Sequence, residues 1–189
     1  MNALPDLTRT VVVGTTGSGK TTLGQRLAAL LDAPFIELDK LHWGPDWTPL
    51  ADEPFREAVT QCVTAEAWVV DGNYGAVRDI IWQRATAIIW LDYPLPLVLW
   101  RLFRRTLWRV FTRQRLFNDN RESFFASFFS RNSLFMWALR KHHSRRQRYS
   151  QHFADGDFAN ATPIVFHKPT HAEAFIELVH QAHKKDQTP

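Results

Sequence analysis

Short apolar runs alternate with longer stretches in which apolar residues recur every three or four positions. The runs have the length of buried strands, and the spacing between them is that of amphipathic helices. We predict strands at 10–13, 35–38, 68–70, 87–91 and 162–166, and helices at 20–31, 54–65, 77–83, from about 97 onwards, and 172–184. Strands that alternate with helices are typical of an α/β fold with a parallel sheet covered by helices on both faces.

Length and composition narrow the class of protein. A chain of 189 residues, 45% hydrophobic, predicts a single domain over 1–189 with a sizeable core. The single cysteine, Cys62, excludes a disulfide within the chain and fits a reducing compartment. The amino-terminal residues do not follow the order of a signal peptide, and the longest apolar run, 87–103, is too interrupted to span a bilayer. We expect a cytoplasmic protein without a membrane partner.

Residues 14–21, GTTGSGKT, satisfy the phosphate-loop pattern G-x-x-x-x-G-K-[ST] between a predicted strand and a predicted helix. Glycines let backbone N–H groups converge on phosphate oxygens, and the helix adds the positive end of its dipole. Lys20 would reach the β- and γ-phosphates, and the Thr21 hydroxyl would ligate Mg²⁺. We therefore expect ATP and Mg²⁺ as cofactors. The nucleotide-binding residues predicted are Gly14, Thr15, Thr16, Gly17, Ser18, Gly19, Lys20, Thr21 and Thr22.

A carboxylate is also needed on the outer side of the magnesium ion. Asp71 and Asp92 each end an apolar run, and the pattern alone does not separate them. Asp39 follows the second predicted strand and is a candidate to orient or deprotonate an acceptor group. Because ligands of open α/β sheets gather at the carboxyl ends of the strands, we expect all three aspartates at one edge.

The positive charge of the chain is concentrated in one segment. Residues 101–148 contain 13 Lys and Arg but only two acidic residues, a net charge of +11, whereas the whole chain carries +4. Such a concentration indicates an anionic partner, either phosphate groups or nucleic acid. A solvated helical face is the simpler interpretation of any charged run.

Several motifs resemble a known family. GTTGSGKTTL, FIELDKLHW, WVVDGNYGAVRD, ATAIIWLDYP, LVLWRLFRRTLWR, FNDNRESF and WALRKHHSRRQRY follow one another across residues 10–150. Together they resemble the small P-loop proteins known as DNA topology modulation proteins, which are similar to adenylate and other nucleoside monophosphate kinases. The resemblance implies a P-loop NTPase fold of three α/β/α layers, with five parallel strands, the third beside the first, and a helical, basic lid.

The resemblance also implies roles for individual residues. It favours Asp71 over Asp92 as the magnesium-side acid. Arg101 and Arg105 correspond to arginines that flank a mobile lid, here about 106–131, and Arg140 and Arg145 resemble the pair after the lid. In the kinases an Asp-Gly-Phe-Pro-Arg segment ends the third strand, and its arginine grips the acceptor phosphate. This chain instead has Asp71-Gly-Asn-Tyr, with Arg78 further on, and the acceptor therefore stays open.

Two functions follow from these observations. The first is an ATP-dependent phosphotransferase, similar to adenylate kinase, that acts on a nucleotide or another small acceptor, with Lys20, Asp39, Arg101, Arg105 and Arg140 as its catalytic residues. The second is an ATP-binding regulatory protein whose basic segment 101–148 contacts DNA and which has no kinase activity.

Overall fold

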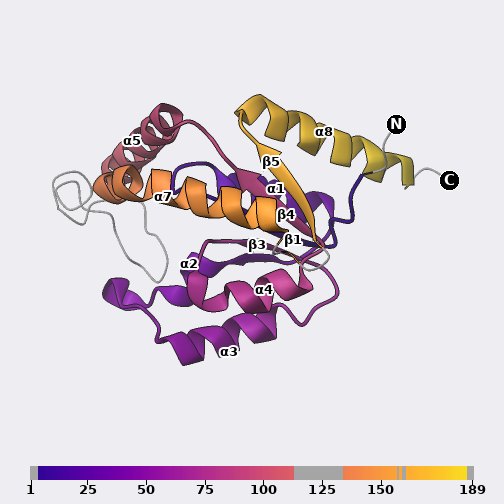
Figure 1. Cartoon of the computed structure of the whole chain (residues 1–189), viewed down its shortest axis with the longest axis horizontal. Helices are drawn as coiled ribbons and strands as arrows, with labels where there is room; N and C mark the ends of the chain where they lie inside the picture. Colours follow the sequence, from indigo (N-terminus) through magenta and orange to yellow (C-terminus); the bar gives the residue numbers. More distant parts are fainter. Residues whose placement is uncertain (1–3, 113–133, 157, 159–160, 187–189) are drawn as a thin grey trace.

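A computed structural model describes residues 4–112, 134–156, 158 and 161–186 and confirms the predicted α/β fold. Five parallel strands form one sheet in the order β2-β3-β1-β4-β5, so the third strand does adjoin the first (Figure 1). The strands are β1 Arg9–Gly14, β2 Phe35–Glu37, β3 Trp68–Asp71, β4 Ala87–Leu91 and β5 Thr162–Phe166. The helices are α1 Lys20–Leu30, α2 Leu38–His42, α3 Asp52–Cys62, α4 Arg78–Arg84, α5 Leu95–Thr112, α7 Leu134–Asp155 and α8 Pro169–Asp186.

The central strand β1 shows why the sheet has helices on both faces. Successive side chains of a strand point to opposite faces, and every residue of 10–13 is buried. Val11 and Val13 belong to a core shared with α3, α4 and α7, whereas Val12 belongs to a second core shared with α1 and α8. Each buried side chain of this size stabilises the fold by about 1.5–3 kcal/mol relative to exposure. The two cores place α3 and α4 on one face of the sheet and α1 and α8 on the other (Figure 1).

The end of the second strand differs from the prediction. β2 stops at Glu37, and α2 begins at Leu38, so Asp39 lies in a short helix rather than at a strand end. Leu38 is 1% exposed, and its apolar character fits a buried strand and a buried first helical residue equally well. The Trp43 N–H donates to the Asp39 carbonyl at 3.1 Å, which closes the helical turn. The predicted strand was therefore one residue too long, because the apolar Leu38 was read as its last buried residue.

The basic segment is helical where it is described. α5 begins at Leu95, two residues before the predicted start, because a proline such as Pro96 is tolerated in the first helical turn. α5 packs against α7. Of the predicted lid, 106–112 belong to α5, and 113–131 lie outside the described residues.

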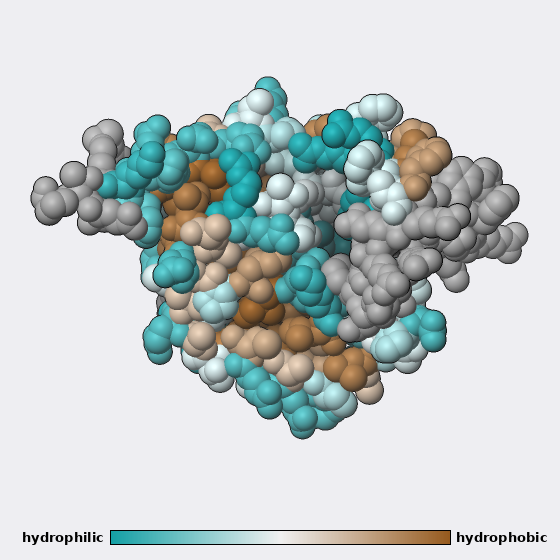
Figure 2. Space-filling view, turned by 180° about the vertical axis from the view of Figure 1, so that it is seen from behind, coloured by the Kyte–Doolittle hydropathy of each residue, from teal (hydrophilic) through white to brown (hydrophobic). Residues whose placement is uncertain are grey.

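In the view from behind, hydrophilic residues cover much of the upper and lower margins, and apolar residues lie across the middle (Figure 2). Within the described ranges, no helix is both long enough and apolar enough to cross a bilayer.

Candidate active site at a phosphate loop

The phosphate loop occupies the turn between β1 and α1, as its sequence predicts. Gly19 immediately precedes α1 and has a φ of 98°, a left-handed conformation that side chains other than glycine rarely adopt. The Ser18 N–H donates to the Thr15 carbonyl at 3.0 Å and tightens the turn. The first turn of α1 contains no acidic residue that would neutralise the positive end of the helix dipole, which lies at the loop because the loop leads directly into α1. This is an arrangement suited to an anion.

A large open cavity lies over this loop. Its volume is about 1670 Å³, and residues 16–22 form part of its wall. Gly14 and Thr15 are buried and do not line the cavity. The acidic lining residues are Glu37, Asp39, Asp71 and Glu173, and the basic ones are Lys20, Arg26, Lys40, Arg101, Arg104, Arg105 and Arg109. The cavity therefore brings together the phosphate loop, the acids Glu37, Asp39 and Asp71, and the arginines of α5.

Asp71 and Thr21 form the candidate magnesium site. β3 lies beside β1, and this places the Thr21 hydroxyl 2.5 Å from Oδ2 of Asp71, to which it donates a hydrogen bond. The other oxygen, Oδ1, is buried and has no hydrogen-bond partner among the described residues. Burial raises the pKa of the Asp71 carboxyl, and the Lys20 ammonium partly opposes this rise. A buried carboxylate with a spare oxygen beside a hydroxyl is a fitting donor set for Mg²⁺.

In the described part of the chain, no three His, Cys, Asp or Glu side chains cluster to hold a metal alone. A Mg²⁺ ion at Thr21 and Asp71 would complete its shell with phosphate and water oxygens, as this ion commonly does.

Asp92, the alternative magnesium-side acid, is engaged elsewhere. It follows β4 on the far side of β1 and is 6% exposed. Nε of Arg146 donates to Oδ2 of Asp92 at 3.2 Å and lies 3.0 Å from Oδ1, and Nδ1 of His167 lies 3.0 Å from Oδ2. These contacts make Asp92 the point at which α7 and the segment after β5 join the sheet.

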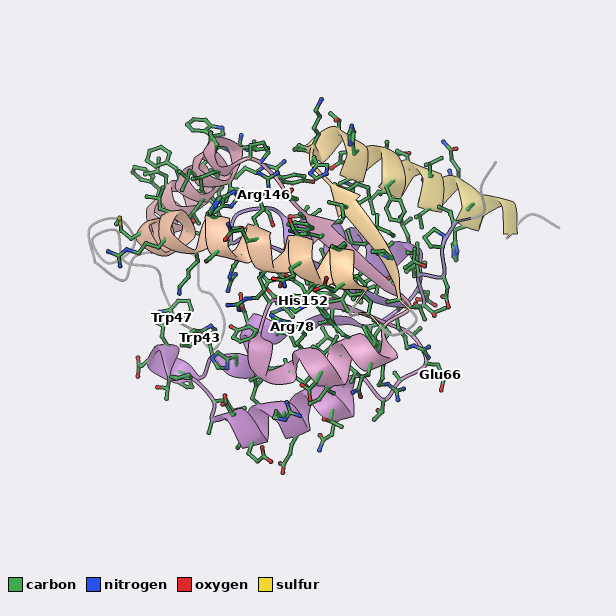
Figure 3. The ribbon with its side chains drawn as sticks, in the orientation of Figure 1. Trp43, Trp47, Glu66, Arg78, Arg146 and His152 are labelled. Atoms are coloured by element: carbon green, nitrogen blue, oxygen red, sulfur yellow. The ribbon has the colours of Figure 1, made fainter. Side chains whose placement is uncertain are left out.

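Asp39 also lines the cavity, close enough to Asp71 for the two charges to interact. The Tyr74 hydroxyl donates to Oδ1 of Asp39 at 2.6 Å, and a hydrogen bond from Trp43 in turn reaches Tyr74. The His42 ring lies 4.6 Å from the Tyr74 ring and 4.9 Å from Trp43, whose ring is 6.0 Å from Trp47. Trp43 and Trp47 lie together below the amino-terminal end of α7 (Figure 3). An exposed carboxylate held by a tyrosine can accept a proton from a bound hydroxyl group.

The predicted arginines occupy different positions. Nη1 of Arg101 donates to the Ser18 carbonyl at 2.9 Å, and its guanidinium lies over the Tyr93 ring. Arg105 lines the cavity and acts on Asp71 through its charge. Arg140 is exposed on α7 and is not part of the cavity wall. The catalytic roles predicted for these arginines stay predictions.

Arg145, which the resemblance paired with Arg140, is half-buried on α7, and burial lowers the pKa of its guanidinium. Sequence reasoning missed other residues that the fold brings to the site. Glu37 also lines the cavity. Burial raises the pKa of the Glu37 carboxyl, and the nearby Lys40 ammonium partly opposes this rise. Asn73 and Tyr74 lie directly after Asp71-Gly72, where the chain departs from the Asp-Gly-Phe-Pro-Arg segment of the kinases. That departure is the sequence signal that could have marked them as site residues.

The comparisons with known proteins agree with this geometry. No family model matches the chain. A curated shikimate kinase of Symbiobacterium thermophilum is 34% identical over 98 residues, which cover 43% of this chain and 56% of that protein. The match thus spans little more than half the length of the relative.

Solved structures resemble the whole chain. A shikimate kinase from Acinetobacter baumannii in complex with shikimate has a TM-score of 0.55 at 18% identity and covers 97% of this chain and 96% of its own. A gluconokinase from Sinorhizobium meliloti has a TM-score of 0.52 at 19% identity, with coverages of 95% and 93%. The chain has the fold of the P-loop kinases. At these identities the likeness establishes the fold alone.

Proposed function

We propose that this chain is an ATP-dependent kinase that transfers a phosphoryl group to a hydroxyl or phosphate group of a small molecule. The observation that carries the proposal is the meeting of two sets of groups in one cavity. Lys20, Thr21 and Asp71 are one set, and Asp39, held by Tyr74, is the other. A nucleotide-binding protein without transfer chemistry has no need of the second set.

Different residues would supply charge neutralisation and proton transfer during phosphoryl transfer. The ammonium of Lys20 and the N–H groups of the loop would neutralise the β- and γ-phosphates, where charge accumulates in the loose transition state. Mg²⁺ held by Thr21 and Asp71 would supply further charge neutralisation. For a hydroxyl acceptor, Asp39 takes the proton while the acceptor oxygen bonds to the γ-phosphorus. The bond from phosphorus to the bridging oxygen breaks, and ADP leaves.

The cavity has room for both reactants. Tyr93, Trp100 and Pro169 line the end away from Asp39, where a nucleobase would lie once the phosphates are in the loop. On the acceptor side, the half-buried Arg145 acts on the Tyr74 hydroxyl through its charge. This supports an acceptor that carries an anionic group. The named relatives act on shikimate and gluconate, both of which are hydroxylated carboxylates.

The direct test is product analysis with ATP and Mg²⁺. The acceptors would be shikimate, D-gluconate, nucleosides and nucleoside monophosphates, with Lys20→Ala as the inactive control. We expect ADP and a phosphorylated acceptor in equal amounts, detected by ³¹P NMR and mass spectrometry. ATP hydrolysis without transfer to any acceptor would refute the kinase assignment.

A second candidate, contact with nucleic acid, is supported by one feature. Arg140, Lys141 and Arg148 are exposed on α7 and lie on one side of the helix. Other bases of the segment are engaged within the protein, such as Arg101 at Ser18 and Arg146 at Asp92. Fluorescence anisotropy with duplex DNA at two salt concentrations tests this candidate, because each neutralised phosphate contributes a log–log slope of about −0.9. Absence of binding at about 50 mM salt would refute it.

A further inference from the structure

The side chain of Asn73 forms bonds that a strand backbone would normally form. The Gly14 N–H donates to Oδ1 of Asn73 at 3.1 Å, and Nδ2 of Asn73 donates back to the Gly14 carbonyl. Oδ1 also accepts a hydrogen bond from the Tyr149 hydroxyl at 3.0 Å. One side-chain amide thus joins the first residue of the phosphate loop to α7.

The strand register explains why an amide is needed there. The ladder between β1 and β3 ends with the pair Val12 and Asp71, followed by a weak bond from the Gly72 N–H to the Val12 carbonyl at 3.4 Å. At Gly72 the chain turns away with a φ of 153°, and a Cβ there would meet Leu38 at 2.7 Å. The backbone of β3 therefore no longer accompanies β1 when β1 reaches Gly14.

An asparagine side chain supplies the missing pair of groups. Its amide carries one carbonyl and one NH₂ group, so it can accept from and donate to the same residue, as a peptide unit does. Aspartate lacks the donor, and alanine lacks both groups. Asn73 thus adds one rung to the ladder beyond the end of the strand.

We propose that Asn73 is a positioning residue that holds the phosphate loop in its nucleotide-binding conformation and links it to α7 through Tyr149. Gly14 begins the loop, and the next residue, Thr15, lies 3.3 Å from Nδ1 of His142, also on α7. Asn73 does not line the cavity, so it acts through Gly14 rather than by touching the phosphates.

The link extends to the acceptor side. α7 carries Tyr149 and His142, which contact the loop region, and also Arg145, which acts on Tyr74. On α7, Arg146 lies on the side opposite His152, which is close to Arg78 (Figure 3). A shift of this helix would therefore affect both the start of the phosphate loop and Tyr74, which holds Asp39.

The inference rests on the proposed nucleotide site and is tested by calorimetry with two probes, ATP–Mg²⁺ and tripolyphosphate–Mg²⁺. Asn73→Ala removes the amide, and Asn73→Asp keeps its shape without the donor. Tyr149→Phe removes only the hydroxyl that meets Oδ1. Gln83→Ala, which removes an exposed amide on α4, is the matched control.

We expect both Asn73 variants to lower the affinity for each probe by about tenfold, which corresponds to about 1.4 kcal/mol of binding free energy. Tyr149→Phe should lower these affinities about threefold, and Gln83→Ala should leave them unchanged. Equal loss for ATP and tripolyphosphate identifies the phosphate loop, because the second probe has no base or sugar. Hydrogen exchange should rise in peptides that cover 14–19 and stay at wild-type rates in β4, a pattern that general destabilisation would not produce.

The outcomes separate the two proposals. A wild-type protein that binds neither probe refutes the nucleotide site itself. Wild-type binding together with unchanged affinity and unchanged exchange in the Asn73 variants refutes the positioning role alone. If Asn73→Ala does not fold, Asn73→Asp and Tyr149→Phe carry the test, since each preserves the shape of the packed side chain.

Discussion

Asp71→Asn and Asp92→Asn are expected to change stability in opposite directions. Both aspartates lie at the carboxyl ends of buried strands and both are buried, but among the described residues only Asp92 has basic side chains, Arg146 and His167, at hydrogen-bond distance. Oδ1 of Asp71 lacks a hydrogen bond within the described ranges, and burial raises the pKa of this carboxyl. The folded state therefore disfavours the charge on Asp71, whereas the carboxylate of Asp92 has basic partners in place.

The magnitude follows from these contacts. A neutral amide at 71 keeps a hydrogen bond with Thr21 and removes a buried charge, a gain of about 1 kcal/mol. A domain of this size gains about 2–4 °C in Tm per kcal/mol. Asp92→Asn weakens the bonds that the carboxylate makes with Arg146 and His167. The cost is limited to about 2 kcal/mol, because both partner side chains are more than half exposed and regain hydration. Asp92→Asn should therefore lower the Tm by about 4–8 °C.

The pH dependence of stability gives an independent check on the sign of the Asp71→Asn effect. A carboxyl whose pKa is raised on folding binds protons more tightly in the folded state, so its contribution to stability is lost as the pH rises through the raised pKa. Below the ordinary value of 3.8, Asp71 is neutral in both states, and Asp71→Asn should bring no gain there. Above the raised pKa of Asp71, the substitution Asp71→Asn should give its full gain in stability. Thermal melts without Mg²⁺ across this range measure it.

Activity should respond in the opposite order. Asp71→Asn should lower Mg²⁺-dependent turnover by at least about 10–100-fold, because loss of a group that only supports a metal ligand already has this cost. Asp92→Asn should retain more of the activity at a temperature where it is folded. If Asp71→Asn lost several degrees, or if Asp92→Asn cost more Mg²⁺-dependent activity, the assignment of Asp71 to the magnesium site would be wrong.

Three further predictions concern Lys20, Tyr74 and the arginines of α7. Lys20→Ala should lower turnover by about 10²–10³-fold, as loss of a transition-state donor does, with a change in unfolding free energy within about 0.5 kcal/mol; unfolding of the variant in a denaturant titration would indicate a structural role instead. Tyr74→Phe should reduce kcat by about tenfold and leave the KM for ATP unchanged, because only the hydroxyl that holds Asp39 is lost; steady-state kinetics showing a raised KM for ATP would contradict this. Arg145→Ala should raise the KM for the acceptor found in the panel more than Arg140→Ala does, because Arg145 is half-buried near Tyr74 and Arg140 is exposed; equal effects would restore the predicted role of Arg140.

The phosphate loop was predictable because it is encoded locally. A strand, a glycine-rich turn and a helix follow one another in 11–31, and each is specified by its own residues. The same holds for the boundaries of β4 and β5, whose apolar runs the structure reproduces residue for residue. The position of β3 beside β1 came from the resemblance to the P-loop family rather than from any pattern in the chain.

Contacts between distant segments could not be predicted in this way. Asp71 and Asp92 end similar apolar runs, and they differ only because β3 passes Thr21, whereas β4 passes under α7 and its Arg146. The choice between Arg140 and Arg145 depends on which side of α7 packs against the sheet. Sequence thus determined the groups that bind phosphate, because their geometry is set by neighbouring residues. Tertiary structure decided which acids and arginines join them, because those distances depend on strand order and helix packing.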